Sequence, residues 1–177
     1  MTITLITGGN KGLGYEAARR LIELGHTVYI GARDEERGRS AAESLGAQFV
    51  QLDVSDDGSA AAAAAEVEQR EGRLDVLINN AGVGAGGAVI GDSALSDWEW
   101  VLNINLWGPI HGCHVFAPIL REARRPAGII NVASAAAFGA APGMAAYNVS
   151  KAAVMALSET LAAELIRIPP DPLTRVF

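Results

Sequence analysis

The stretch Thr7-Gly8-Gly9-Asn10-Lys11-Gly12-Leu13-Gly14 decides the fold of this chain. It follows an apolar, strand-like run, residues 2–7, and leads into the helical spacing of residues 13–24, which Gly25 is placed to end. Glycine is needed where the backbone turns sharply or approaches a pyrophosphate, and the helix N-terminus offers unpaired amides to phosphates. The turn alone also suits an ordinary strand-to-helix loop. Its place in the first βαβ unit favours a dinucleotide site.

Beyond this turn, short apolar runs alternate with segments of helical spacing. Strands are expected at 27–32, 47–53, 75–79 and 127–133, and helices at 34–45, 55–72, 96–121 and 145–166. Asp34 and Ser96 are placed to cap the helices that follow them, and Ser55 or Asp56 opens the third helix. Buried strands alternating with helices predict a doubly wound, Rossmann-like α/β fold with a parallel sheet, in a single domain over residues 1–177.

Composition excludes several classes of function. The net charge of −6 and the pI near 5.0 argue against a nucleic-acid partner, because binding phosphate backbones needs clustered cations. Cys113 is the only cysteine, so no internal disulfide or zinc cluster is expected, and His111 and His114 beside it do not make a metal site. No run reaches the roughly 18 apolar residues of a membrane span. We expect a cytoplasmic protein that binds no membrane.

The segment Tyr147-Asn148-Val149-Ser150-Lys151 carries the candidate chemistry. Residues four apart share one helical face, so the Lys151 ammonium can lie beside the Tyr147 phenol and favour its phenolate form. The phenol would then exchange a proton with an alcohol or carbonyl substrate. Taken alone, the pair could equally be two exposed side chains on a helix.

Together, the Thr-Gly-x-x-x-Gly-x-Gly turn and the Tyr-x-x-x-Lys pair resemble the short-chain dehydrogenase/reductase family, closest in flavour to its carbonyl-reductase type. The resemblance implies that Ser134, 13 residues before Tyr147, is the catalytic serine. It also implies that Asn105, rather than the nearby Asn103, supports a water relay to Lys151. The catalytic residues would thus be Asn105, Ser134, Tyr147 and Lys151.

The same resemblance implies where the cofactor lies. Asp53 matches the acid that contacts adenine, and Asn79-Asn80-Ala81-Gly82 matches a segment that lines the cofactor groove, with Asn79 in a structural role. The predicted cofactor-binding residues are Gly8, Asn10, Lys11, Gly12, Leu13, Gly14, Arg33, Asp53, Val54, Asn80, Ala81, Gly82, Tyr147 and Lys151.

The end of the second strand indicates which nicotinamide cofactor is bound. An acid at this point would receive the ribose hydroxyls of NAD, but Ala32 stands at the family's position and Arg33 follows it. Arg33 and Lys11 together suit a 2′-phosphate, so NADP(H) is favoured over NAD. Asp34 is a competing acid, which we expect to act as a helix cap. The alternative is that both cations are solvated surface charges.

The family resemblance implies an NADP(H)-dependent oxidoreductase that transfers hydride between nicotinamide and a carbonyl or secondary alcohol. It also implies a homo-oligomer, because relatives form a subunit interface with the helix that follows Ser96 and the Tyr147-bearing helix. The pattern departs from the family after residue 165. Prolines at 169, 170 and 172 predict that no regular central strand follows, so the fold is expected to be incomplete at its C-terminal end. The edge of the fifth strand would then be open, or covered by the tail or another subunit. The alternative function is a weakly active dinucleotide-binding module that serves as a sensor or interaction partner.

Overall fold

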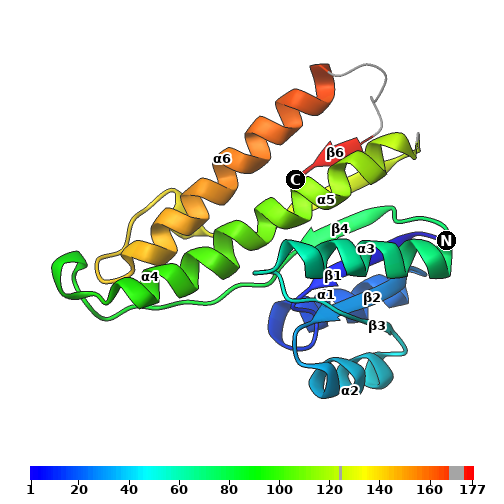
Figure 1. Cartoon of the computed structure of the whole chain (residues 1–177), viewed down its shortest axis with the longest axis horizontal. Coiled ribbons are helices and arrows are strands. Elements are labelled where there is room, and N and C mark those ends of the chain that lie inside the picture. The colour runs from blue at the N-terminus through cyan, green and yellow to red at the C-terminus, as the bar shows by residue number, and fades with distance from the viewer. Residues whose placement is uncertain (124, 168–173) are drawn as a thin grey trace.

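A computed structural model describes residues 1–123, 125–167 and 174–177, and this part of the chain forms a parallel sheet with helices on both faces (Figure 1). The strand order is β3-β2-β1-β4-β5-β6, and every neighbouring pair is parallel. The order reverses at β1, so the carboxyl ends of β1 and β4 flank the crevice in which doubly wound folds bind ligands. The predicted fold class is confirmed. The strands are β1 (Ile3–Thr7), β2 (Thr27–Ala32), β3 (Gln48–Gln51), β4 (Val76–Asn79), β5 (Ala127–Asn131) and β6 (Thr174–Val176).

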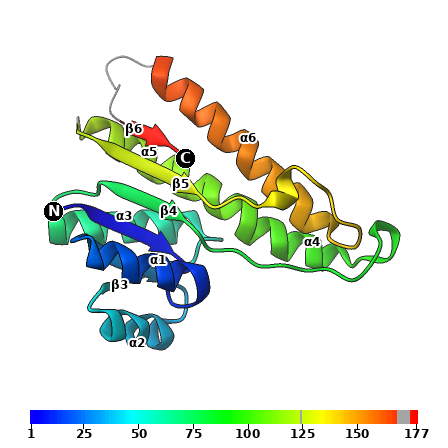
Figure 2. The same cartoon turned by 180° about the vertical axis from the view of Figure 1, so that it is seen from behind.

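The sheet carries a layer of helices on each face, and a separate buried hydrophobic cluster lies between each layer and the sheet (Figures 1 and 2). On one face, α3 and α5 pack on the sheet, and α6 joins them through Leu157 and Leu161. On the other face, α1 and α2 cover β1, β2 and β3. The helices are α1 (Gly12–Glu23), α2 (Glu35–Leu45), α3 (Asp57–Glu71), α4 (Leu95–Leu102), α5 (Gly108–Glu122) and α6 (Ala145–Arg167).

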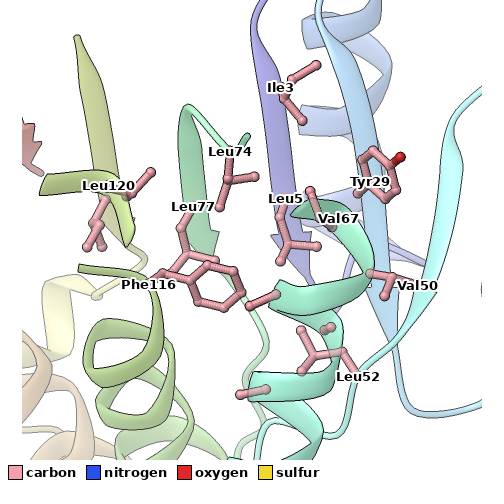
Figure 3. Close-up of a cluster of buried hydrophobic side chains, with 14 of the residues drawn as sticks. Ile3, Leu5, Tyr29, Val50, Leu52, Val67, Leu74, Leu77, Phe116 and Leu120 are labelled. Carbon is pink, nitrogen blue, oxygen red and sulfur yellow. The ribbon is translucent and has the colours of Figure 1, made fainter. Parts of the chain in front are cut away.

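The larger cluster holds the middle of the sheet against α3 and α5 (Figure 3). Leu5 and Leu77 from neighbouring strands are fully buried, and Phe116 and Leu120 of α5 lie over them. Fully burying a side chain of this size contributes about 1.5–3 kcal/mol, so α5 is fixed firmly on the sheet. Tyr29 extends this cluster, and its hydroxyl donates to Glu71 Oε1 at 2.8 Å, which together with burial raises the pKa of Tyr29 to about 12.

Most predicted helix boundaries are confirmed by their caps. The Asp34 carboxylate accepts a hydrogen bond from the backbone N–H of Arg37, and Asp56 rather than Ser55 caps α3. Gly25 follows the C-cap of α1 with a φ of 86°. The prediction for Ser96 was wrong, because α4 begins at Leu95 and its N-cap is Ala94, which makes no side-chain cap bond. Ser96 therefore lies inside the helix.

The predicted continuous helix over 96–121 is also corrected. A π-helical segment, Asn103–Trp107, separates α4 from α5. The wider turn adds a residue to the hydrogen-bond ladder and turns Asn105 toward the interior, where its side chain is fully buried. π-segments of this kind occur frequently at functional sites.

The edge of β5 is covered by the tail of the chain. Thr174–Val176 pairs with β5 as β6, from Ala127↔Thr174 to Ile129↔Val176, and Phe177 exchanges backbone hydrogen bonds with Ile129 and Asn131. Of the alternatives for this edge, the tail is the one observed. It forms a three-residue strand at the edge of the sheet, not the regular central strand that the prolines argue against. The three prolines lie at 168–173, outside the described residues. The strand forms after the last of them, at the edge of the described sheet, where short strands are common.

Candidate active site

The glycine turn closes tightly on the end of β4. Gly8 and Gly12 have positive φ angles of 64° and 59°, which other residues adopt with strain. At Gly14, an added Cβ would lie 2.4 Å from Asn80 Nδ2 and 2.8 Å from the Gly8 carbonyl oxygen. The start of α1 can therefore approach β4 only because Gly14 has no side chain. The predicted need for glycine at this turn has a specific steric cause.

Hydrogen bonds from Asn80 and Ala81 fix the turn to β1. The Thr7 hydroxyl accepts from the backbone N–H groups of Asn80 and Ala81, both at 3.0 Å. Asn80 Nδ2 donates in turn to the carbonyls of Thr7 at 2.9 Å and Gly8 at 3.3 Å. These bonds join the carboxyl ends of β1 and β4. The floor of the crevice is therefore held together by hydrogen bonds within the chain.

A groove with a volume of about 730 Å³ runs over these strand ends. It gathers most of the predicted cofactor-binding residues from four separate segments. Gly14, Tyr147 and Lys151 are outside its lining, although Gly82 connects it to Lys151, whose Nζ lies 3.7 Å from the position of a Gly82 Cβ. The predicted residues that line the groove are Gly8, Asn10, Lys11, Gly12, Leu13, Arg33, Asp53, Val54, Asn80, Ala81 and Gly82.

One end of the groove is positively charged. Lys11 and Arg33 line it, and so does Arg37, which the sequence analysis did not single out. All three side chains are exposed. The competing acid, Asp34, accepts from the Arg37 backbone N–H at 3.0 Å and lies 3.5 Å from the Arg37 guanidinium. Asp34 is thus engaged in capping α2. Arg37 lies in the first turn of α2, four residues after Arg33 in the sequence.

Lys151 is the buried cation of the site. Its side chain is 5% exposed, and Nζ donates to the Val132 carbonyl at 2.7 Å and lies 5.8 Å from the centre of the Tyr147 ring. Burial lowers the pKa of Lys151. The predicted pairing of these two residues on one face of α6 is therefore present in the structure. Because Val132 follows β5, the position of the ammonium is tied to the sheet.

Ser134 lies in the segment that follows β5, two residues after Val132. It is half-buried and caps a short 3₁₀ turn, Ala135–Ala137, with its hydroxyl accepting from the Ala136 N–H at 3.2 Å. Among the hydrogen bonds of the described residues, none joins Ser134 to Tyr147 or Lys151. Ser134 thus follows, two residues along the chain, the Val132 carbonyl that holds Lys151 Nζ.

Asn105 joins three elements behind the site. Its Oδ1 accepts from the Val83 N–H at 2.8 Å, and its Nδ2 donates to the Val83 carbonyl at 2.8 Å and to Ser150 Oγ at 3.2 Å. Both Asn105 and Ser150 are fully buried. The side chain therefore fixes the loop after β4 to the residue that precedes Lys151. Asn103 is exposed, as expected of the alternative that was set aside.

Asn79 has a structural role, as predicted. Its Nδ2 donates to Asn131 Oδ1 at 2.8 Å, and Asn131 Nδ2 donates to Ser158 of α6 at 2.9 Å. Cys113 lies beside both amides, and burial raises the pKa of its thiol to about 11. Consecutive residues Asn79 and Asn80 thus serve opposite sides of the sheet, one in the interior and one at the groove.

Comparison with known proteins gives a consistent result. Residues 2–168 match the family model described as short chain dehydrogenase. The chain is 37% identical over 172 residues to the rhamnolipids biosynthesis 3-oxoacyl-[acyl-carrier-protein] reductase of Pseudomonas aeruginosa. It is 32% identical over 164 residues to the NADP-dependent (R)-specific alcohol dehydrogenase of Lentilactobacillus kefiri. These matches cover 93% and 90% of this chain.

Solved structures show the same likeness. A short chain dehydrogenase/reductase from Burkholderia phymatum, in complex with NAD, superposes with a TM-score of 0.93 at 35% identity over 99% of this chain. This chain spans 63% of that structure's chain, 67% of the Pseudomonas reductase and 65% of the Lentilactobacillus dehydrogenase. The similarity therefore covers nearly all of the present sequence and about two thirds of each relative.

Proposed function

Because this chain belongs to the short-chain dehydrogenase family, we propose that it is an NADP(H)-dependent oxidoreductase that transfers hydride between nicotinamide and a carbonyl or secondary alcohol. The observation that carries this proposal is the buried Lys151 ammonium beside Tyr147, next to Gly82 of the glycine-lined groove. Burial disfavours the charged form of a lysine, so a buried lysine beside a phenol is a candidate for chemistry at that phenol.

The groove fits a dinucleotide in both form and chemistry. Gly12 has a positive φ and no atom within 4 Å of where a Cβ would stand, so the backbone at the start of α1 is open to a ligand. The amides at this helix N-terminus favour phosphate oxygens. Asp53 and Val54 line the groove at the end of β3, where an adenine would lie. When bound, nicotinamide would accept or deliver the hydride.

Tyr147 would supply or remove the proton in this reaction. In reduction, its hydroxyl would donate to the carbonyl oxygen as hydride arrives at carbon, and in oxidation its phenolate would accept the proton from the alcohol. The Lys151 ammonium stabilises that phenolate by its charge, and the Val132 carbonyl keeps Nζ in place. Ser134 would donate a hydrogen bond to the reacting oxygen and orient it.

The charged end of the groove supports NADP(H) over NAD(H). Lys11, Arg33 and Arg37 offer three cations to a 2′-phosphate, and the position that an acid would need for the ribose of NAD is Ala32. The Lentilactobacillus relative is named as NADP-dependent, whereas the Burkholderia structure holds NAD. Within the family both cofactors occur, so these side chains carry the inference.

A titration of the purified protein tests the proposal first. NADPH and NADH are added separately and followed by the fluorescence of the reduced nicotinamide. We expect NADPH to bind at least about tenfold more tightly than NADH, because charge-assisted hydrogen bonds to a phosphate contribute about 1.5–3 kcal/mol. Equal affinities would contradict the NADP(H) preference, and no binding of either would contradict the oxidoreductase.

We also propose a cytoplasmic homo-oligomer with a small-molecule substrate. Trp100 and Trp107 are 46% and 50% exposed on the α4–α5 surface, where the family resemblance places a subunit contact. In the described part of the chain, no helix is long and apolar enough to cross a membrane. Light scattering coupled to size-exclusion chromatography would give the molar mass and hence the oligomeric state. A monomer at micromolar concentration would contradict this part of the proposal.

A further inference from the structure

The loop after β3 forms one wall of the groove but receives little support from the sheet. The last bond of its strand joins the Leu52 N–H to the Ala32 carbonyl at 3.0 Å. Beyond it, Asp53 Oδ1 accepts from the N–H and hydroxyl of Ser55, and the Asp53 N–H donates to Ser59 at 2.9 Å. All of these partners lie in the loop or in α3. These hydrogen bonds shape the loop but do not attach it to α5.

A side chain from α5 supplies that missing attachment. His111 Nδ1 lies 3.0 Å from the carbonyl oxygen of Val54, across 57 residues of sequence. A carbonyl can only accept, so Nδ1 must carry the proton, and the neutral Nδ1–H form and the imidazolium both satisfy the bond. Among the hydrogen bonds of the described residues, this one alone links the groove-lining part of the loop to α5.

The surface of α5 around His111 is shaped for this contact. Gly108, one turn earlier, is buried against Val54, and a Cβ there would lie 3.1 Å from the Val54 side chain. The half-exposed Trp107 ring lies beside the imidazole, with 5.7 Å between the ring centres. The helix thus offers Val54 a space for its side chain and a donor for its carbonyl.

We propose that His111 is a positioning residue for the adenosine half of the cofactor, because it holds the Val54 carbonyl and thereby the Asp53–Val54 wall of the groove. This proposal rests on the dinucleotide binding proposed above. His111 itself does not line the groove, so its effect is transmitted through Val54. Because Val54 lines the groove, the influence of His111 falls on cofactor affinity.

Two substitutions separate the hydrogen bond from the packing of the ring. His111→Phe keeps a ring beside Trp107 and removes the donor, whereas His111→Asn removes the ring and keeps an amide N–H near the position of Nδ1. His114→Ala is the matched control, because His114 is an exposed histidine three residues further along the same helix. Each variant is titrated with NADPH and with 2′,5′-ADP, which contains only the adenosine half.

We expect His111→Phe to weaken both ligands by the same factor, about five- to tenfold, the effect of losing one hydrogen bond. His111→Asn and His114→Ala should remain close to the unsubstituted protein. Unchanged affinity in His111→Phe, or equal losses in His111→Phe and His111→Asn, would overturn the positioning role. If the unsubstituted protein binds neither ligand, the proposed function fails instead, so the two failures are distinguishable.

Discussion

The groove and the region around Lys151 differ in the kinds of residue that form them. The cofactor groove is formed by backbone, glycine and exposed cations, and the side chains that would select the cofactor, Arg33 and Arg37, contribute little to the core. The end at which we propose proton transfer is formed by buried polar side chains such as Asn105 and Lys151, whose hydrogen bonds also join separate parts of the fold. We infer from this difference that substitutions of the exposed cations cost little stability, whereas substitutions of the buried polar residues cost more.

The largest effect should come from the proton-transfer end. Tyr147→Phe removes the proposed acid/base and should lower the rate of NADPH-dependent carbonyl reduction by about 10²–10⁴-fold, the usual contribution of a positioned proton donor. The NADPH dissociation constant, measured by fluorescence, should be unchanged and serves as the control. Equal rates in the two proteins would leave a binding module with no role for the phenol.

The next effect concerns the stability of the same end. Asn105→Ala leaves the Val83 N–H and carbonyl without their partner and should lower the free energy of unfolding by about 2–4 kcal/mol, because buried polar groups without hydrogen bonds are costly. Urea denaturation measures it. The exposed Asn103→Ala is the matched control and should change stability by less than about 0.5 kcal/mol. Similar values for both would mean that Asn105 does not hold the loop.

The substitution Gly14→Ala tests whether the groove depends on the close approach of α1 to the end of β4. The added Cβ would lie 2.4 Å from Asn80 Nδ2, so the turn must shift, at a cost of about 1–3 kcal/mol. We expect weaker NADPH binding together with a lower midpoint of thermal unfolding. Gly91→Ala, where a Cβ meets open space, should change neither quantity. A Gly14→Ala protein that binds normally would show that the close approach is unnecessary.

The smallest effect should come from the exposed cations. Arg37→Ala should weaken NADPH binding about three- to tenfold and leave NADH binding unchanged, because an exposed charge contributes modestly. Arg39→Ala is the control, since Arg39 is also an exposed arginine of α2 but pairs with Glu35 and does not line the groove. If both substitutions weakened NADPH alike, the effect would belong to net charge rather than to a specific contact.

The sequence was informative where a pattern has one structural meaning. Apolar runs, the glycines of the turn and the caps Asp34 and Asp56 predicted the strands and most helix limits, because each acts through local geometry. The π-segment around Asn105 was missed, since an extra residue in a helical ladder leaves the composition unchanged. The strand after residue 173 was missed because a three-residue edge strand depends on its neighbour for hydrogen bonds.

The same limit applies to the site. Motif spacing brought Tyr147 and Lys151 together correctly, because an i,i+4 pair is fixed by the helix itself. The contact of His111 with Val54 could not be foreseen, since it joins residues 57 positions apart through packing of α5 against the sheet. Long-range contacts of this kind depend on tertiary structure, and a single sequence carries no local sign of them.

The side-chain amides of Asn79 and Asn131 form a buried hydrogen bond between β4 and β5. They stand opposite each other in the register of β4 and β5, and their hydrogen bond locks that register. One of these strands leads to the cofactor groove and the other to Ser134 and the Lys151 anchor. A slip of one residue would reverse the facing of every side chain beyond it. We infer that this cross-strand pair helps to fix the groove relative to the Val132 carbonyl that holds Lys151.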